Sequence, residues 1–182
     1  MVNQTEKTDI YSGLDEKAEL LFQYQSVMYS FSLFAHDYGT GIVMSEVEAH
    51  TLNYINAEPG LIATRLVELT DRTKSAVSQT LRQLEKQGLI RREINPLNKR
   101  EYLIFVTEIG AKTCAAHRNY DREGVTNQIN SLLESCTPEE IESFFKVLRC
   151  RIAHFKRVNA ELRKIIPPNR KRPLLKPNFK TC

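Results

Sequence analysis

Residues 61–107 read LIATRLVELTDRTKSAVSQTLRQLEKQGLIRREINPLNKREYLIFVT, and this stretch decides the fold. Apolar residues recur at helical spacing over 61–69, and the polar segment 70–73 that follows is short enough to be a tight turn. A second helix is predicted from Thr73 to Gln87, with Thr73 as its N-cap and Gly88 as the residue that ends it. Two short helices must therefore cross at this turn.

The second of these helices has two different faces. At 100° per residue, Val77, Leu81 and Leu84 fall on one side of it. Polar side chains fall on the other side, namely Ser75, Ser78, Gln79, Arg82 and Lys86. One face can pack against the protein, and the other stays free to bind.

A β-hairpin is predicted after the two helices. Residues 89–94 and 101–106 are rich in β-branched and aromatic side chains, and the Asn-Pro pair in the segment 95–100 between them is typical of a loop. Helix, turn, helix and hairpin in this order indicate a winged helix-turn-helix, whose second helix enters the major groove of double-stranded DNA. The alternative is a structural pair of helices with a solvated hairpin. Any one of these elements alone would be compatible with that alternative.

The same stretch resembles the MarR family of bacterial transcriptional regulators. The resemblance lies in SAVS at 75–78, LEKQGLIRR at 84–92, NPLNKR at 95–100 and VTEIG at 106–110. It implies a homodimer on an inverted-repeat operator, often a repressor that a small aromatic ligand or oxidation releases. The flanking segments 14–38 and 108–166 resemble the family in order and length, which implies a helical dimerisation domain.

Two departures from the family pattern concern DNA contact. The family usually has an acidic residue at the position of Asn98, where a salt bridge aims the arginine two positions later, here Arg100, into the minor groove. Asn98 can instead hydrogen-bond a guanidinium, so Arg100 is kept as a wing contact. Gln79 stands where the family often has arginine, and its amide suits adenine rather than guanine. The expected DNA contacts are Lys74, Ser75, Ser78, Gln79, Arg82, Asn98, Lys99 and Arg100.

The predicted fold class is mainly α with a small β-hairpin wing, a winged helix-turn-helix plus a helical dimerisation domain. We expect an N-terminal arm at 1–12, a first dimerisation helix within 13–43, the DNA-binding region at 44–107, C-terminal dimerisation helices at 108–166 and a basic tail at 167–182. The first helix, 14–38, is apolar on two sides, so its own subunit and a partner must both cover it. Capping boxes are predicted at Ser45 to Glu48 and at Thr137 to Glu140.

Charge is unevenly distributed along the chain, whose net charge is +4. Residues 61–100 carry nine Lys and Arg against four Asp and Glu, and residues 167–182 carry five against none. This excess of positive charge favours phosphate binding. The chain has no apolar run long enough to span a membrane, and its first thirty residues carry too many charges for a signal peptide. A cytoplasmic protein without a membrane partner is expected.

Catalytic chemistry is not indicated, because the histidines are scattered and neither a nucleophile with its base nor a glycine-rich phosphate loop is present. We therefore expect no enzyme and no cofactor. Cys114 and His117 lie one helical turn apart, and His50 or His36 could complete a metal site. A metal-sensing regulator thus stays open, as does a winged-helix module for protein interaction or assembly without a specific operator.

The expected signal for such a regulator is a small aromatic ligand. An aromatic ligand is expected to lodge where the first two helices meet the DNA-binding region, with Tyr24, Met28 and Phe31 as candidate walls. Oxidation is the rival trigger. Cys114 and Cys150 are expected to be buried and inert, because they lie in helical patterns where a free cysteine acts as a small hydrophobe.

Overall fold

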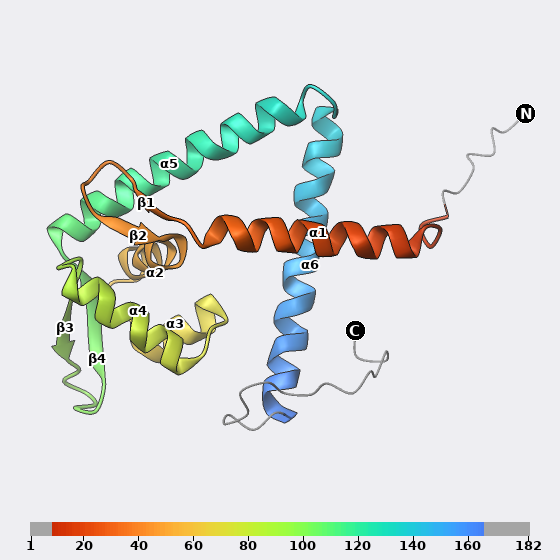
Figure 1. Cartoon of the computed structure of the whole chain (residues 1–182). Helices are drawn as coiled ribbons and strands as arrows, with labels where there is room; N and C mark the ends of the chain where they lie inside the picture. Colours follow the sequence, from red (N-terminus) through yellow and green to blue (C-terminus); the bar gives the residue numbers. More distant parts are fainter. Residues whose placement is uncertain (1–8, 166–182) are drawn as a thin grey trace, which may run out of the picture. The chain divides into compact units, whose positions relative to one another are not determined.

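The computed structural model describes residues 9–165, so the predicted basic tail and most of the predicted N-terminal arm lie outside the described residues. The chain divides into two compact units at the bond between His117 and Arg118. Its elements are, in order, α1 (Leu14–Ser32), β1 (Ala35–Asp37), β2 (Val43–Ser45), α2 (Glu46–Ala57), α3 (Ala63–Thr70), α4 (Lys74–Lys86), β3 (Ile90–Ile94), β4 (Tyr102–Val106), α5 (Glu108–Leu132) and α6 (Pro138–Ile165) (Figure 1). The predicted class, mainly helical with a small β-hairpin, is confirmed.

The core of the first unit is built by α2, α3, α4 and the hairpin β3–β4. Val77, Leu81 and Leu84 of α4 are buried, as the sequence periodicity predicts. They belong to one apolar cluster with Leu52 and Ile55 of α2. Burial of this stripe leaves the opposite face of α4 in solvent.

The helix ends follow the predicted capping chemistry. The Thr73 hydroxyl accepts a hydrogen bond from the Ala76 backbone N–H at 3.2 Å and starts α4. Gly88 has a φ of 72°, the left-handed conformation expected after the last turn. Ser45 and Glu48 form the predicted capping box of α2. These caps fix where α2 and α4 begin, and therefore where the polar face of α4 points.

The predicted first helix, 14–38, is wrong at its C-terminal end. Helix α1 stops at Ser32, and β1 and β2 then pair as an antiparallel hairpin. The Asp37 carboxylate accepts from the backbone N–H groups of residues 39, 40 and 41 at 2.9 to 3.0 Å, which closes the hairpin tip. Tyr38 and Met44 enter the core as a result, with 8% and 1% of their surface exposed.

The second hairpin is the predicted wing. Strands β3 and β4 pair antiparallel from Ile90 opposite Val106 to Ile94 opposite Tyr102. The Asn95 backbone N–H donates to the Glu101 carbonyl at 3.0 Å and closes the loop between the strands. Ile104 also bridges to Leu61 before α3, so the base of the wing is anchored to the helix-turn-helix.

The second unit contains the end of α5 and all of α6. Helix α6 starts with the predicted cap, because the Thr137 N–H donates to the Glu140 carboxylate at 2.8 Å and the Glu140 N–H donates to the Thr137 hydroxyl at 3.2 Å. Among residues 9–165, no helix is both long enough and apolar enough to cross a membrane.

Candidate nucleic-acid interface

The polar face of α4 presents the predicted contacts to solvent. Lys74, Ser75, Gln79 and Arg82 are exposed, and Ser78 is half-buried. An Arg82 guanidinium nitrogen donates to the Ser78 hydroxyl at 3.3 Å, so these two side chains lie one turn apart on the same face. The arrangement places donors and an amide where a helix in the major groove meets base edges.

The wing tip carries the other predicted contacts, Asn98, Lys99 and Arg100, and all three are exposed. The Asn98 side-chain oxygen accepts from the backbone N–H of Arg100 at 3.2 Å. Asn98 therefore shapes the loop through the backbone, whereas we expected it to bond a guanidinium. The Arg100 side chain lines a small cavity of about 160 Å³ that it shares with Arg92 and Tyr102.

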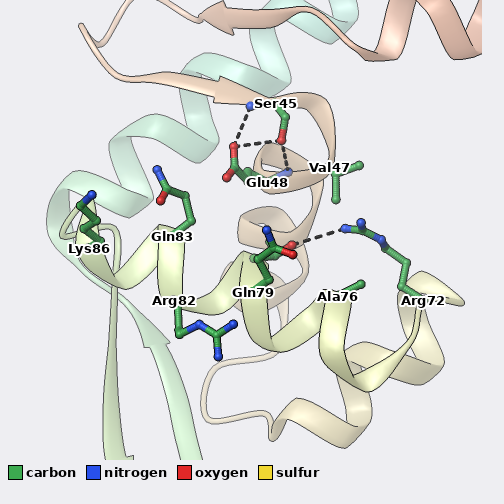
Figure 2. A pocket seen from close by; sticks show the side chains of 10 residues that line it. Ser45, Val47, Glu48, Arg72, Ala76, Gln79, Arg82, Gln83 and Lys86 are labelled. Atoms are coloured by element: carbon green, nitrogen blue, oxygen red, sulfur yellow. Dashed lines mark hydrogen bonds between the residues drawn. The ribbon is translucent and has the colours of Figure 1, made fainter. Parts of the chain in front are cut away.

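A hollow of about 510 Å³ lies between the start of α2 and the exposed face of α4. Figure 2 shows the Arg72 side chain at one end of this hollow. An Arg72 guanidinium nitrogen donates to the Thr80 hydroxyl of α4 at 3.3 Å. Arg82 and Lys86 also line the hollow, and its one carboxylate, Glu48, is bonded to Ser45. Sequence reasoning missed Arg72 because it placed this residue in the turn and considered only the helix and the wing.

Several arginines of the helix-turn-helix and the wing form ion pairs with glutamate carboxylates. Hydrogen bonds to the Glu68 and Glu58 carboxylates raise the pKa of Arg65 above its ordinary value. Arg91 pairs with Glu93, and Arg92 pairs with Glu85. Within residues 9–165, no carboxylate forms an ion pair with the predicted DNA-contacting cations, which are Lys74, Arg82, Lys99 and Arg100. Their positive charge is thus available to phosphates.

The three predicted ligand-binding residues lie on α1. Tyr24, Met28 and Phe31 are 49%, 44% and 51% exposed, and α1 buries none of its residues in the single chain. Their spacing places them along one side of the helix. Their role as walls of a ligand pocket stays a prediction.

The weak metal candidates separate into two groups. Cys114 is part of the apolar core, at 1% exposed. His117 is equally buried, and its ring lies edge-on to those of Tyr38 and His50, at centroid distances of 4.6 and 4.9 Å. The structure therefore brings His50 to His117. Among the other cysteines, Cys150 is exposed, which corrects the expectation that it is buried.

The comparison with known proteins agrees with this geometry. Residues 44–101, from β2 through the wing tip, match the model of the MarR family. This region is similar to the winged helix-turn-helix of the MarR family. The match ends at the wing tip, just before β4, so it covers the helix-turn-helix and the first strand of the wing and not the flanking helices α1, α5 and α6.

Curated relatives of the MarR-family region are transcriptional regulators, and none is named as an enzyme. The HTH-type transcriptional regulator PetP of Rhodobacter capsulatus is 34% identical over 76 residues, which is 42% of either chain. The transcriptional regulator HosA of Escherichia coli O111:H- is 36% identical over 59 residues, 32% of this chain and 44% of HosA. The chain thus spans less than half the length of the curated relatives that it matches.

Solved structures show the same fold over more of the chain. MarR superposes with a TM-score of 0.56 at 23% identity, over 84% of this chain and 97% of MarR. Staphylococcus aureus MepR in its DNA complex has a TM-score of 0.61 at 22% identity, over 74% and 96%. Streptococcus pneumoniae FabT in complex with DNA has a TM-score of 0.57 at 19% identity, over 80% and 96%. At these identities the likeness concerns the fold alone.

Proposed function

We propose that this chain is a sequence-specific DNA-binding regulator of transcription that acts as a homodimer on an inverted-repeat operator. The observation that carries the proposal is the exposed face of α4, which combines Gln79 with the cations Lys74 and Arg82 that no carboxylate of the described chain pairs. A helix with this face reads the major groove, while Arg100 on the wing reaches the backbone and the minor groove.

Support for a homodimer comes from the apolar surface that the single chain leaves exposed. Helix α1 buries none of its residues, although Phe22 and Val27 are exposed by 63% and 68%. On α6, Phe144 and Phe155 are exposed by 48% and 45%. Helices so apolar are stable in water only when another surface covers them, and a second copy of the chain supplies that surface. Two subunits also present two α4 helices to an operator with two-fold symmetry.

Selection of operators from random duplexes by the purified full chain tests this function. We expect a palindromic consensus whose half-sites lie about 34 Å apart, one turn of DNA. The competing function is a winged helix for protein interaction or assembly. It predicts that no sequence is enriched and that any DNA binding is equal on all duplexes, which would overturn the proposal.

Gln79 is expected to read a base. Gln79→Ala should cost about 1–3 kcal/mol per half-site on the selected operator and relax the preference at one base pair, because the amide is lost from the N-terminal half of α4. Binding to random DNA should stay as in the wild type, since Gln79 carries no charge. The measurement is a pair of affinity titrations, and equal losses on both DNAs would contradict base reading.

Arg100 is expected to act through the DNA backbone and minor groove. Arg100→Ala should weaken binding and lower the slope of log affinity against log salt by about one contact per subunit. Lys99→Ala is the matched variant at the next position, and it should have a smaller effect because an ammonium suits a narrow minor groove less well than a guanidinium. An Arg100→Ala protein that matches the wild type throughout a salt titration would mean that the wing makes no contact.

The regulator is proposed to be a repressor that an apolar or aromatic acid releases, with Tyr24, Met28 and Phe31 as candidate contacts. Such a ligand acts by preferring a spacing of the two α4 helices that does not fit the operator. Benzoate or a larger aromatic acid should therefore weaken operator binding, whereas peroxide should not, because the Cys114 thiol is buried and the exposed Cys150 lies on α6 rather than on α4 or the wing. Release by stoichiometric peroxide, abolished by Cys114→Ser or Cys150→Ser, would show that oxidation is the trigger.

A further inference from the structure

The tip of the wing carries the most exposed large apolar side chain among residues 9–165. Leu97 is 95% exposed, and the loop that holds it projects beyond α4 (Figure 1). Ile94 and the aromatic Tyr102, at the adjoining ends of β3 and β4, are 62% and 51% exposed. We call Ile94, Leu97 and Tyr102 the wing-tip patch. Single exposed apolar residues are normal on a protein, but a group of them at one loop tip is typical of a binding surface.

The wing-tip patch continues a face of the hairpin that begins in the core. Ile94 and Tyr102 are directly opposite each other in the antiparallel register, so their side chains lie on the same side of the hairpin. Ile90 and Ile104 lie on that side as well, because side chains alternate along a strand, and both are buried. The apolar face therefore runs past the edge of the core and out to the tip, where it is open to solvent.

Hydrogen bonds within the loop hold the backbone of Leu97 in place. The Leu97 N–H donates to the side-chain oxygen of Asn95 at 3.0 Å. The Asn98 N–H donates to the Asn95 carbonyl at 3.2 Å, and the Glu101 N–H donates to the Asn98 carbonyl at 2.9 Å. Pro96 has a fixed φ, which further restricts the turn. Leu97 is thus presented on a closed turn, and little conformational entropy is lost when it enters a binding partner.

The surroundings of the wing-tip patch fit DNA better than protein. The loop from Asn95 to Arg100 carries two cations, Lys99 and Arg100, and no carboxylate. Three apolar side chains are also too few for a stable protein interface, which takes about 800 Å² from each partner. The minor groove of B-DNA is only about 6 Å wide and is bordered by phosphates, so it admits one loop tip whose cations bind those phosphates.

We propose that Leu97 is an apolar wedge that enters the minor groove at each half-site and partly separates two stacked base pairs. Leucine is among the side chains that insert between base steps in this groove and kink the duplex. Pyrimidine–purine steps such as TA and CA unstack most easily, so the wedge adds a preference for such a step where α4 does not read the bases. Ile94 and Tyr102 pack against the sugars at the edge of the groove. This inference rests on the proposed DNA-binding function and adds an apolar contact to that of Arg100.

Fluorescence of 2-aminopurine tests the wedge, because unstacking of this base raises its emission. The base replaces adenine at successive positions in and beside each half-site of the selected operator, and the full chain is then added. We expect emission to rise at one pyrimidine–purine step per half-site. A rise spread evenly over all positions would indicate general deformation of the duplex and would overturn a wedge at one step.

Leu97→Ala should remove this rise and weaken operator affinity about tenfold per half-site, because the buried apolar contact is lost. The slope of log affinity against log salt should stay as in the wild type, since Leu97 has no charge, whereas Arg100→Ala lowers that slope. The melting temperature should also stay the same, because Leu97 is exposed. Leu97→Met keeps an apolar side chain of similar size and is the matched control, which should retain both the rise and the affinity.

The outcomes separate the wedge from the DNA-binding function. A wild-type chain that binds the operator without any local rise would overturn the wedge alone. A Leu97→Ala protein with wild-type affinity and emission would do the same and would assign the wing-tip patch to a protein partner. If the wild type binds all duplexes alike, the operator proposal fails, and the assay on a random duplex that contains TA steps still tests the wedge. A chain that binds no duplex would overturn both proposals.

Discussion

Gly110→Ala should lower the stability of this protein clearly. A Cβ at Gly110 would lie 2.1 Å from the backbone carbonyl oxygen of Leu89, a contact that no side-chain movement relieves. The backbone must shift instead, and such overpacking costs about 1–3 kcal/mol, occasionally more. We expect a clear fall in melting temperature and in the urea midpoint.

The effect should also reach DNA binding, because Gly110 lies at the junction of α4, the wing and α5. The Thr107 hydroxyl donates to the Gly88 carbonyl at 2.7 Å and accepts from the Gly110 N–H at 3.1 Å. The Thr107 N–H donates to the Leu89 carbonyl at 2.9 Å. A displaced Leu89 therefore moves the end of α4 and the base of β3 together.

Gly124→Ala is the matched control on the same helix. A Cβ at Gly124 meets no atom within 4 Å, so the substitution should raise stability by about 0.5–1 kcal/mol through the lower backbone entropy of alanine in the unfolded chain. Urea unfolding of both variants beside the wild type measures the contrast. Gly110→Ala unfolding at the wild-type midpoint would show that α5 does not approach Leu89 this closely.

Phe144→Asp has the second large expected effect, the dissociation of the homodimer. Phe144 is 48% exposed in the single chain, so the subunit can fold with Asp at this position. In a dimer whose apolar interface covers α6, the same carboxylate would lose its hydration without gaining a partner. We expect dimer affinity to fall by two orders of magnitude or more, on the scale of about 1.4 kcal/mol per factor of ten.

Ser143→Asp adds the same charge to the preceding, exposed position of α6 and serves as the control. Sedimentation at micromolar concentration should show a dimer for the wild type and for Ser143→Asp, and a monomer for Phe144→Asp. Circular dichroism should show native helix content in all three proteins. Operator affinity should fall with dimerisation, because one α4 helix then faces one half-site. A wild-type chain that sediments as a monomer would end the homodimer proposal.

Short-range chemistry explains which features the sequence alone could predict. The caps at Ser45 and Thr73, the turn glycine Gly88 and the apolar stripe of α4 depend on residues within one or two turns of each other. Their geometry is the same wherever such residues occur. The winged helix-turn-helix and the exposed side of α4 could therefore be read directly from the residues.

The end of α1 could not be read in this way. Phe34 and Tyr38 continue a helical period, but the Asp37 carboxylate binds three successive backbone N–H groups and turns the chain into a hairpin. Tyr38 then packs into a core made by residues far along the chain. The burial gained there outweighs a local helical preference, because helix propensity differs by less than about 1 kcal/mol per residue among ordinary residues.

The contacts between distant residues were decided by the tertiary structure alone. The start of α2 and the exposed face of α4 enclose the hollow, and His50 on α2 meets His117 on α5, which is 67 positions away in the sequence. No local pattern encodes such pairs, because their distance depends on how α2, α4 and α5 pack. The sequence was sufficient for the caps, the α4 helix and the wing, whose interactions are local. The hollow between α2 and α4 and the contact between His50 and His117 exist only because burial of one shared core brings separate helices together.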